Sequence, residues 1–139
     1  MASTTFRTFV DNIEALEVAG VTRRYIEGPP ASSAAATPFQ YVRYPRGNQG
    51  PIVFGEGGGP PTMIAEMVIC VEEVAQNVQS ENFDNTVDMM DAVNTAIRAA
   101  GNCWPGKGKA NWEIRMGVDT VAGTDYWAVI TTITGSGGL

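Results

Sequence analysis

The chain contains no histidine, only two cysteines, and nine basic residues against fifteen acidic ones. Without histidine, it lacks the side chain that most often transfers protons near neutral pH. A zinc site needs histidines or several closely spaced cysteines, and Cys70 and Cys103 are far apart in the sequence. The net charge of −6 disfavours a dedicated nucleic-acid-binding protein, because affinity for phosphate comes from Lys and Arg.

Long hydrophobic runs are also missing, since no apolar stretch reaches the roughly 18 residues of a membrane-spanning helix. The first residues (MASTTF) do not have the pattern of a signal peptide. We therefore expect a reducing compartment without a disulfide, and a buried, hydrophobic role for Cys70. With 139 residues, 44% of them hydrophobic, the chain is expected to form one domain over residues 1–139.

The first half of the sequence predicts one helix and two short strands. Apolar residues at helical spacing predict a helix over 5–19, which Gly20 ends. Alternating β-branched and aromatic residues predict strands over 21–26 and 39–44. Prolines on both sides of the second strand favour the edge of a sheet. Residues 45–61 are rich in Gly and Pro and predict a long loop.

The second half predicts a strand, a helix and a hairpin. Residues 62–76 are nearly all apolar, which is typical of a strand covered on both faces. Residues 85–100 have the spacing of an amphipathic helix. Residues 111–121 and 126–134 alternate like the two strands of an antiparallel hairpin. The glycine-rich residues 135–139 are expected to form a flexible tail.

The order of these elements, α-β-β-β-α-β-β, predicts an α+β fold. We expect a mixed, mainly antiparallel sheet of about five strands packed by two helices. Trp112 and Ile114 alternate with Glu113 and Arg115, so we expect the two apolar side chains to lie in the core. If both helices cover one face of the long apolar strand, a partner chain is one candidate for covering the other face.

The sequence places no catalytic groups where they could act together. Glu72 and Glu73 are neighbours on a predicted strand and therefore point to opposite faces. Glycines over 55–59 resemble a phosphate-binding loop, but Pro60 and a strand follow where such a loop needs a helix. We therefore expect no catalytic residue, no cofactor and no metal site.

The long loop supplies the candidate contact residues. Ile52, Val53 and Phe54 form an apolar triplet, and apolar groups exposed together on a soluble protein are usually covered by something. Two alternatives stay open, since the triplet can fold back onto its own core or dock on a neighbouring subunit. Together with Arg46 and Glu56 of the same segment, these residues are candidate contacts to another chain.

One arrangement of segments covers residues 5–134. It consists of a first helix, an RRY strand, a proline-bounded aromatic strand (PFQYVRYP), a long loop, the strand TMIAEMVICVEEVAQNVQ, a second helix and a closing hairpin. This pattern resembles the tail terminator proteins of long-tailed bacteriophages. Head–tail connector and minor tail proteins of similar size resemble it as well. The Gly-rich loop 55–61 departs from a typical tail terminator.

The resemblance implies a ring, usually hexameric, that caps the finished tail tube and joins it to the head connector. The implied partners are further copies of the chain, the tail tube protein and the head–tail connector protein. DNA would pass through the ring without specific binding. The implied location is the head-proximal end of the phage tail in the virion, after synthesis in the host cytoplasm. The family has no enzymatic activity and no cofactor.

Two other functions remain compatible with the residues alone. The first is a small ligand- or protein-binding module with a pocket between the sheet and the helices. The second is an enzyme with a carboxylate site that no motif reveals. Self-association separates these alternatives, because a ring protein forms large assemblies whereas a binding module is usually a monomer or a dimer.

Overall fold

The computed structural model describes residues 5–26, 30, 37–49, 61–74, 79–100, 104–105 and 110–136. Two helices and five strands follow in the order α-β-β-β-α-β-β, so the predicted α+β fold is confirmed. Their bounds are α1 (Phe6–Glu14), β1 (Arg23–Arg24), β2 (Phe39–Asn48), β3 (Thr62–Glu73), α2 (Gln79–Ala99), β4 (Ala110–Val121) and β5 (Thr124–Ser136).

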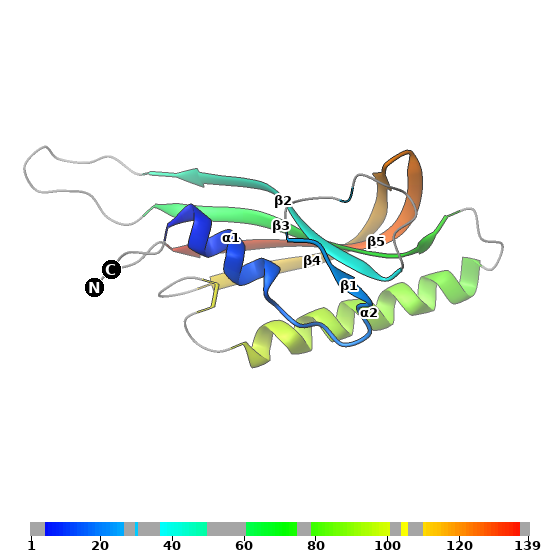
Figure 1. The fold of residues 1–139 in the computed structure, drawn as a ribbon. Coiled ribbons are helices and arrows are strands. Elements are labelled where there is room, and N and C mark those ends of the chain that lie inside the picture. The colour runs from blue at the N-terminus through cyan, green and yellow to red at the C-terminus, as the bar shows by residue number, and fades with distance from the viewer. Residues whose placement is uncertain are drawn as a thin grey trace, which may run out of the picture.

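The five strands form one mixed sheet in the order β1-β2-β3-β5-β4. β1 runs parallel to β2, and every other neighbouring pair is antiparallel. Both helices lie on the same side of this sheet (Figure 1). The protein is therefore a two-layer structure in which the central strand β3 is flanked by β2 and β5.

A hydrophobic core fills the space between the helices and the sheet. Phe9 and Ile13 of α1 are fully buried there, as is Val93 of α2, and Ile97 is nearly so. On the sheet side they meet residues of β3 and β5 such as Ile69. Burying an aliphatic or aromatic side chain of this size contributes about 1.5–3 kcal/mol. This core therefore fixes both helices on the sheet.

A second apolar cluster lies on the face of the sheet opposite the helices. Phe39 and Tyr126 pack edge to face with ring centroids 5.2 Å apart, and Val68 is fully buried beside them. On the helix side of β3, Met67 is also fully buried. The predicted burial of β3 on both faces is therefore confirmed, and the subunit achieves it without a partner chain.

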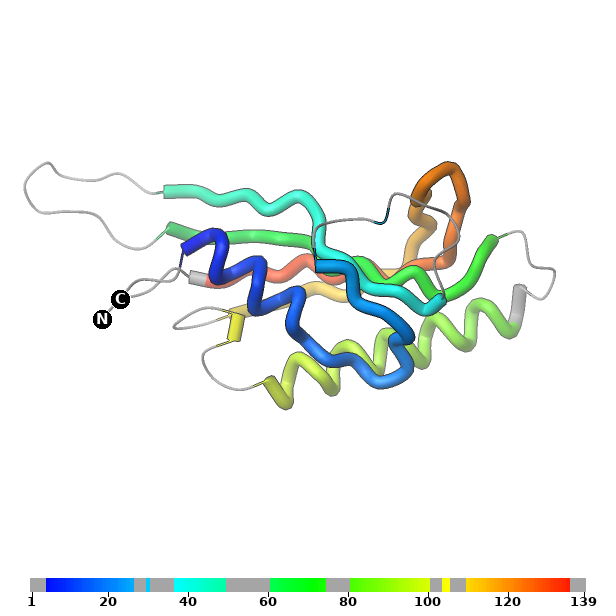
Figure 2. Tube along the Cα trace, in the orientation of Figure 1, coloured from blue at the N-terminus to red at the C-terminus, as the bar shows by residue number. Residues whose placement is uncertain are grey.

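Small side chains let the sheet curl over this second cluster. Cys70 pairs with Ala128, which pairs in turn with Gly117 on β4. A Cβ atom on Gly117 would lie 3.2 Å from Cδ1 of Ile130, so the site leaves little room for a side chain. Figure 2 shows the β4–β5 hairpin bending away from the helix layer. The end of β4 thereby approaches β2 across two intervening strands.

Both helices differ in extent from the sequence prediction. α1 ends at Glu14 because Leu16 and Val18, two positions apart and both buried, have the spacing of an extended segment. α2 begins at Gln79 rather than at residue 85. Asn82, in the added turns, is buried although it is polar, so the apolar spacing does not reveal this part of the helix. Neither helix, as far as the chain is described, is long and apolar enough to cross a membrane.

Two strands run further than predicted, while β1 is reduced to two residues. β2 continues through Pro45 to Asn48, which pairs with Thr62, so the first residues of the predicted loop belong to the sheet. β5 continues to Ser136, which also pairs with Thr62, so the tail begins later than predicted. Pairing with β3 accounts for both extensions, because it satisfies the backbone hydrogen-bonding groups.

Candidate functional site

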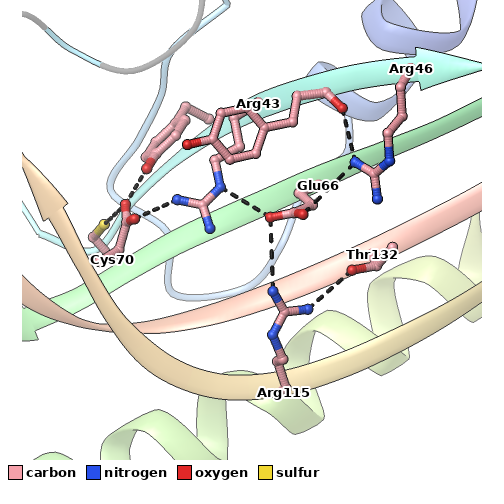
Figure 3. A network of polar contacts seen from close by, with 9 residues as sticks. Arg43, Arg46, Glu66, Cys70, Arg115 and Thr132 are labelled. Atoms are coloured by element: carbon pink, nitrogen blue, oxygen red, sulfur yellow. Dashed lines mark hydrogen bonds and ion pairs between the residues drawn. The ribbon is translucent and has the colours of Figure 1, made fainter.

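The most polar part of the sheet lies on the face opposite the helices. Arg43 and Arg46 of β2, Glu66 of β3, and Arg115 and Asp119 of β4 form a connected set of ion pairs there (Figure 3). We call these five residues the arginine cluster. It is the largest network of charged side chains among the residues described.

Glu66 is the centre of the arginine cluster. Its carboxylate accepts a hydrogen bond from Nε of Arg43 at 3.1 Å. Nitrogens of Arg46 and Arg115 approach the same carboxylate at 3.9 Å from two other sides (Figure 3). The Glu66 side chain is only 13% exposed, whereas those of Arg46 and Arg115 are 49% and 44% exposed. The two outer arginines therefore present their charge to solvent.

A bulge in β2 places Arg43 and Arg46 on the same face. Arg43 pairs with Glu66 and Arg46 pairs with Ile64, so β2 holds one residue more than β3 between these pairs. Tyr44 has a φ of 52°, in the left-handed region, at this point. Without the extra residue, Arg46 would point towards the helix layer, because side chains alternate along a strand.

Asp119 ties the curled end of β4 to β2. Its carboxylate accepts short hydrogen bonds from the Tyr41 hydroxyl and from Nη1 of Arg43, although these residues lie more than 70 positions away. Asp119 and Tyr41 are both buried. A buried carboxylate is tolerated where donors satisfy it, and here one donor is a guanidinium. The arginine cluster therefore also stabilises the curvature of the sheet.

The arginine cluster carries excess positive charge. Three guanidinium groups face two carboxylates, which leaves one net positive charge on a chain whose total is −6. Asp119 is occupied by Arg43 and Tyr41, so Glu66 alone contacts both Arg46 and Arg115. The exposed part of the cluster can therefore accept a further anionic group.

The titratable groups beside Asp119 are held in their protonated forms. Burial raises the pKa of Tyr41 and that of Cys70, and the nearby Asp119 carboxylate raises both further. Burial lowers the pKa of Arg43, but Asp119 and Glu66 outweigh this and raise it overall. Cys70 is therefore a thiol rather than a reactive thiolate, and Tyr41 acts as a hydrogen-bond donor.

Glu72 and Glu73 lie on opposite faces of the sheet, as the sequence predicts. Glu72 accepts a hydrogen bond from Asn85 of α2, on the helix side. Glu73 pairs with Tyr126, which belongs to the opposite face. Across the described ranges, no group of three or more Cys, Asp or Glu side chains is placed to hold a metal ion.

A hollow of about 360 Å³ lies between the end of β3 and α2. Gly20, Val71 and Met89 line it, together with the carboxylates of Glu72 and Asp88. This is where a small-molecule ligand would bind if the protein were the binding module considered above.

Of the candidate contact residues, only Arg46 lies within the described part of the chain, and it belongs to the arginine cluster. Ile52, Val53, Phe54 and Glu56 lie outside the described residues. Their role as contacts to another chain remains a prediction.

Sequence reasoning missed Glu66 and Asp119 as partners of the arginines. Glu66 is the only charged residue between Thr62 and Val71, and a lone charge in a buried strand signals an ion-pair partner.

The sequence matches no protein-family model and no curated protein. Function is therefore inferred from the geometry and from the pattern of the sequence.

Proposed function

We propose that the protein is a structural subunit of the tail terminator type, which assembles into a closed, hexameric ring. The observation that carries this proposal is the free edge of β4. This strand is 12 residues long and, in the described part of the chain, pairs only with β5. Long edge strands expose backbone N–H and C=O groups that proteins usually cover or block.

The two edges of the sheet differ in a way that favours assembly through β4. At the other edge, β2 is partly paired with β1 and carries Pro45 and the bulge at Tyr44. Bulges and prolines are devices that prevent strand addition. β4 pairs with β5 through 12 consecutive residues without a bulge, and Val118 on it is 51% exposed. A neighbouring subunit would cover this edge.

The chemistry of the helix-free face also fits a structural role. Cys70 is fully buried and its pKa is raised by burial, so it is a poor nucleophile. The carboxylates Glu72 and Glu73 lie on opposite faces and cannot act on one substrate. The order of elements agrees with the pattern on which the resemblance to tail terminators is based.

In this role the ring caps the tail tube and joins it to the head connector. Its partners are the tail tube protein and the head–tail connector protein, and its location is the head-proximal end of the tail in the virion. DNA passes through the opening without specific binding. A subunit of net charge −6 fits this, because it offers little attraction to phosphate.

The mass of the purified chain and its images in the electron microscope test the proposal. We expect closed rings, either alone or after addition of the tail tube protein, which the rings should cap at one end. A chain that stays monomeric at high concentration, with and without tube protein, would contradict the proposal. A dimer that binds a small molecule in the hollow beside Met89 would favour the binding module instead.

A further inference from the structure

The exposed side of α2 carries a line of acidic residues. Glu81, Asp84, Asp88 and Asp91 are spaced by three, four and three residues, and all four are exposed. At about 100° per residue they lie on one side of the helix, opposite the side that packs on the sheet. We call these four residues the acidic stripe. It points away from the layer that holds the arginine cluster.

The fold of the subunit explains only part of the acidic stripe, because Glu81 lies in the first turn of α2 and complements the helix dipole there. Neighbouring carboxylates three or four positions apart repel each other and weaken the helix. Among the described residues, no Lys or Arg forms an ion pair with any of the four. The only basic residue near the end of α2 is Arg98, seven positions beyond Asp91. Asp88 and Asp91 lie beyond the first turns and repel each other, which fits a contact outside the subunit.

The arginine cluster is complementary to the acidic stripe. Arg46 and Arg115 are about half exposed, and both share the single carboxylate of Glu66 at 3.9 Å. Each guanidinium has five N–H donors that can bind carboxylates, and the contacts to Glu66 and its neighbours use only some of them. The subunit thus presents a row of exposed carboxylates on its helix layer and partly exposed guanidinium groups on the opposite face of its sheet.

We infer that the acidic stripe of one copy docks on the arginine cluster of the next copy. This rests on the proposed function and identifies the surfaces that would close the ring. Two different surfaces of one subunit meet in a head-to-tail contact, which is the kind that closes into rings. The docked α2 would also lie against β4, because Arg115 is on that strand. A helix over a sheet edge is one of the usual ways to cover it.

A second copy fits these surfaces better than nucleic acid does. The arginine cluster has only one excess positive charge, and the chain as a whole is strongly acidic. Phosphate binding requires several uncompensated basic side chains. The same chain, in contrast, carries a row of exposed carboxylates on its opposite side.

Two charge-reversed proteins test the contact. The stripe variant carries Asp84→Lys and Asp88→Lys, and the cluster variant carries Arg46→Glu and Arg115→Glu. In the cluster variant, surfaces of like charge would meet. In the stripe variant, the two introduced lysines would face the arginines and, with the two remaining carboxylates, would leave the stripe without net charge. We therefore expect the mass of either variant alone to shift to that of a single subunit. In an equimolar mixture, alternating copies place the introduced lysines of one protein against the introduced glutamates of the other, and the unchanged stripe against the unchanged cluster. We expect the mixture to regain the mass of the ring.

Two controls accompany these variants. Glu17→Lys with Asp125→Lys changes the net charge by the same amount as the stripe variant, at exposed positions outside both surfaces. This control protein should assemble like the unmodified chain. Circular dichroism and thermal melting show whether each variant is folded. If the cluster variant unfolds, Arg46→Gln with Arg115→Gln replaces it, and this milder change should weaken assembly.

The possible outcomes separate this inference from the proposed function. If the unmodified chain never assembles, both are wrong. If it forms rings and both variants also form rings, or if the mixture stays dissociated, the docking contact is wrong while the ring stands. If the unmodified chain shifts duplex DNA in a gel, and the cluster variant loses this shift without a change in assembly, the cluster binds nucleic acid and the inference is overturned.

Discussion

At the scale of single residues, the carboxylate of Asp119 connects the end of β4 with β2 across the curved sheet. Asp119 binds the hydroxyl of Tyr41 and the guanidinium of Arg43, both on β2, from a strand at the far edge of the sheet. Arg43 also donates a hydrogen bond to Glu66. This one side chain therefore links Asp119, which holds the curved end of β4, with the carboxylate that contacts the exposed arginines. The shape of the subunit and its charged surface therefore depend on each other.

Replacing Asp119 by Asn should destabilise the subunit. The substitution keeps the size of the side chain but removes the negative charge that binds Arg43 and Tyr41. Hydrogen bonds to charged groups contribute about 1.5–3 kcal/mol, so we expect a loss of that size in the free energy of unfolding. Urea denaturation measures it. Glu113→Gln on the same strand is the control, and this exposed position should change stability by less than about 0.5 kcal/mol.

The buried hydroxyl and thiol beside Asp119 should make stability fall in alkali. In the folded protein, the pKa values of Tyr41 and Cys70 are raised above their ordinary values of 10.0 and 9.0. The unfolded chain therefore releases these protons at lower pH than the folded one does. The stabilisation is complete below about pH 9 and is lost progressively as the pH rises further.

Urea midpoints between neutral pH and about pH 10.5 measure this decline. Tyr41→Phe should make it shallower, because this group no longer titrates, while Cys70 and Tyr126, whose pKa is also raised by burial, still do. Tyr44→Phe is the matched control, since Tyr44 lies on the same strand but is 64% exposed. A decline that is equally steep in the Tyr41 variant and in the unmodified chain would show that other groups cause it.

At the scale of elements, the β4–β5 hairpin was predictable from sequence, but its curvature was not. Trp112 and Ile114 alternate with exposed residues, as expected, although both are half-buried rather than fully in the core. Alternation reveals a strand because one of its faces is covered. The curl depends instead on Gly117 lying beside Ala128, and this contact is defined only once the register is known.

The turn of this hairpin offers a stabilising substitution. Ala122 and Gly123 have φ values of 49° and 85°, and a turn with two such residues favours Asn-Gly. An Ala residue is strained in the left-handed region, where Asn is tolerated better. Ala122→Asn should therefore raise the free energy of unfolding by about 0.5–1 kcal/mol in urea denaturation. Ala122→Val should lower it, and equal effects of the two would rule out turn strain as the cause.

Trp112 should be important for holding β4 against α2. Its indole packs beside the main core, and Nε1 donates a hydrogen bond to Asn94 of α2 at 3.0 Å. Because the side chain is only half-buried, we expect Trp112→Ala to cost about 2–4 kcal/mol, less than for a fully buried tryptophan. Trp112→Phe keeps most of the packing and should cost about 1 kcal/mol. Thermal melting that is unchanged by Trp112→Ala would contradict this contact.

At the scale of the whole molecule, the acidic stripe and the arginine cluster lie on the two opposite layers. Part of this could be predicted, since Arg46 was a candidate contact, whereas Asp84 lay outside the predicted helix 85–100 and joins the stripe only because α2 begins at Gln79. The partners of Arg46 could not be predicted. Glu66 reaches it only because the bulge at Tyr44 turns the strand, and bulges leave little trace in a single sequence.

This separation of charge predicts that salt acts in opposite directions on assembly and on folding. Raising the NaCl concentration from about 0.05 to about 0.5 M shortens the range of electrostatic interactions, so contacts between the acidic stripe and the arginine cluster should weaken and the rings should dissociate. Within a single subunit, the same screening reduces repulsion among Glu81, Asp84, Asp88 and Asp91 and should stabilise α2 slightly. The variant Arg46→Gln with Arg115→Gln weakens assembly, keeps the stripe intact and adds no carboxylate beside Glu66. At a concentration where it is a single subunit, its urea midpoint should rise with salt, while the ring mass of the unmodified chain falls. Rings that persist at high salt would show that apolar contacts, rather than the charged surfaces, hold the copies together.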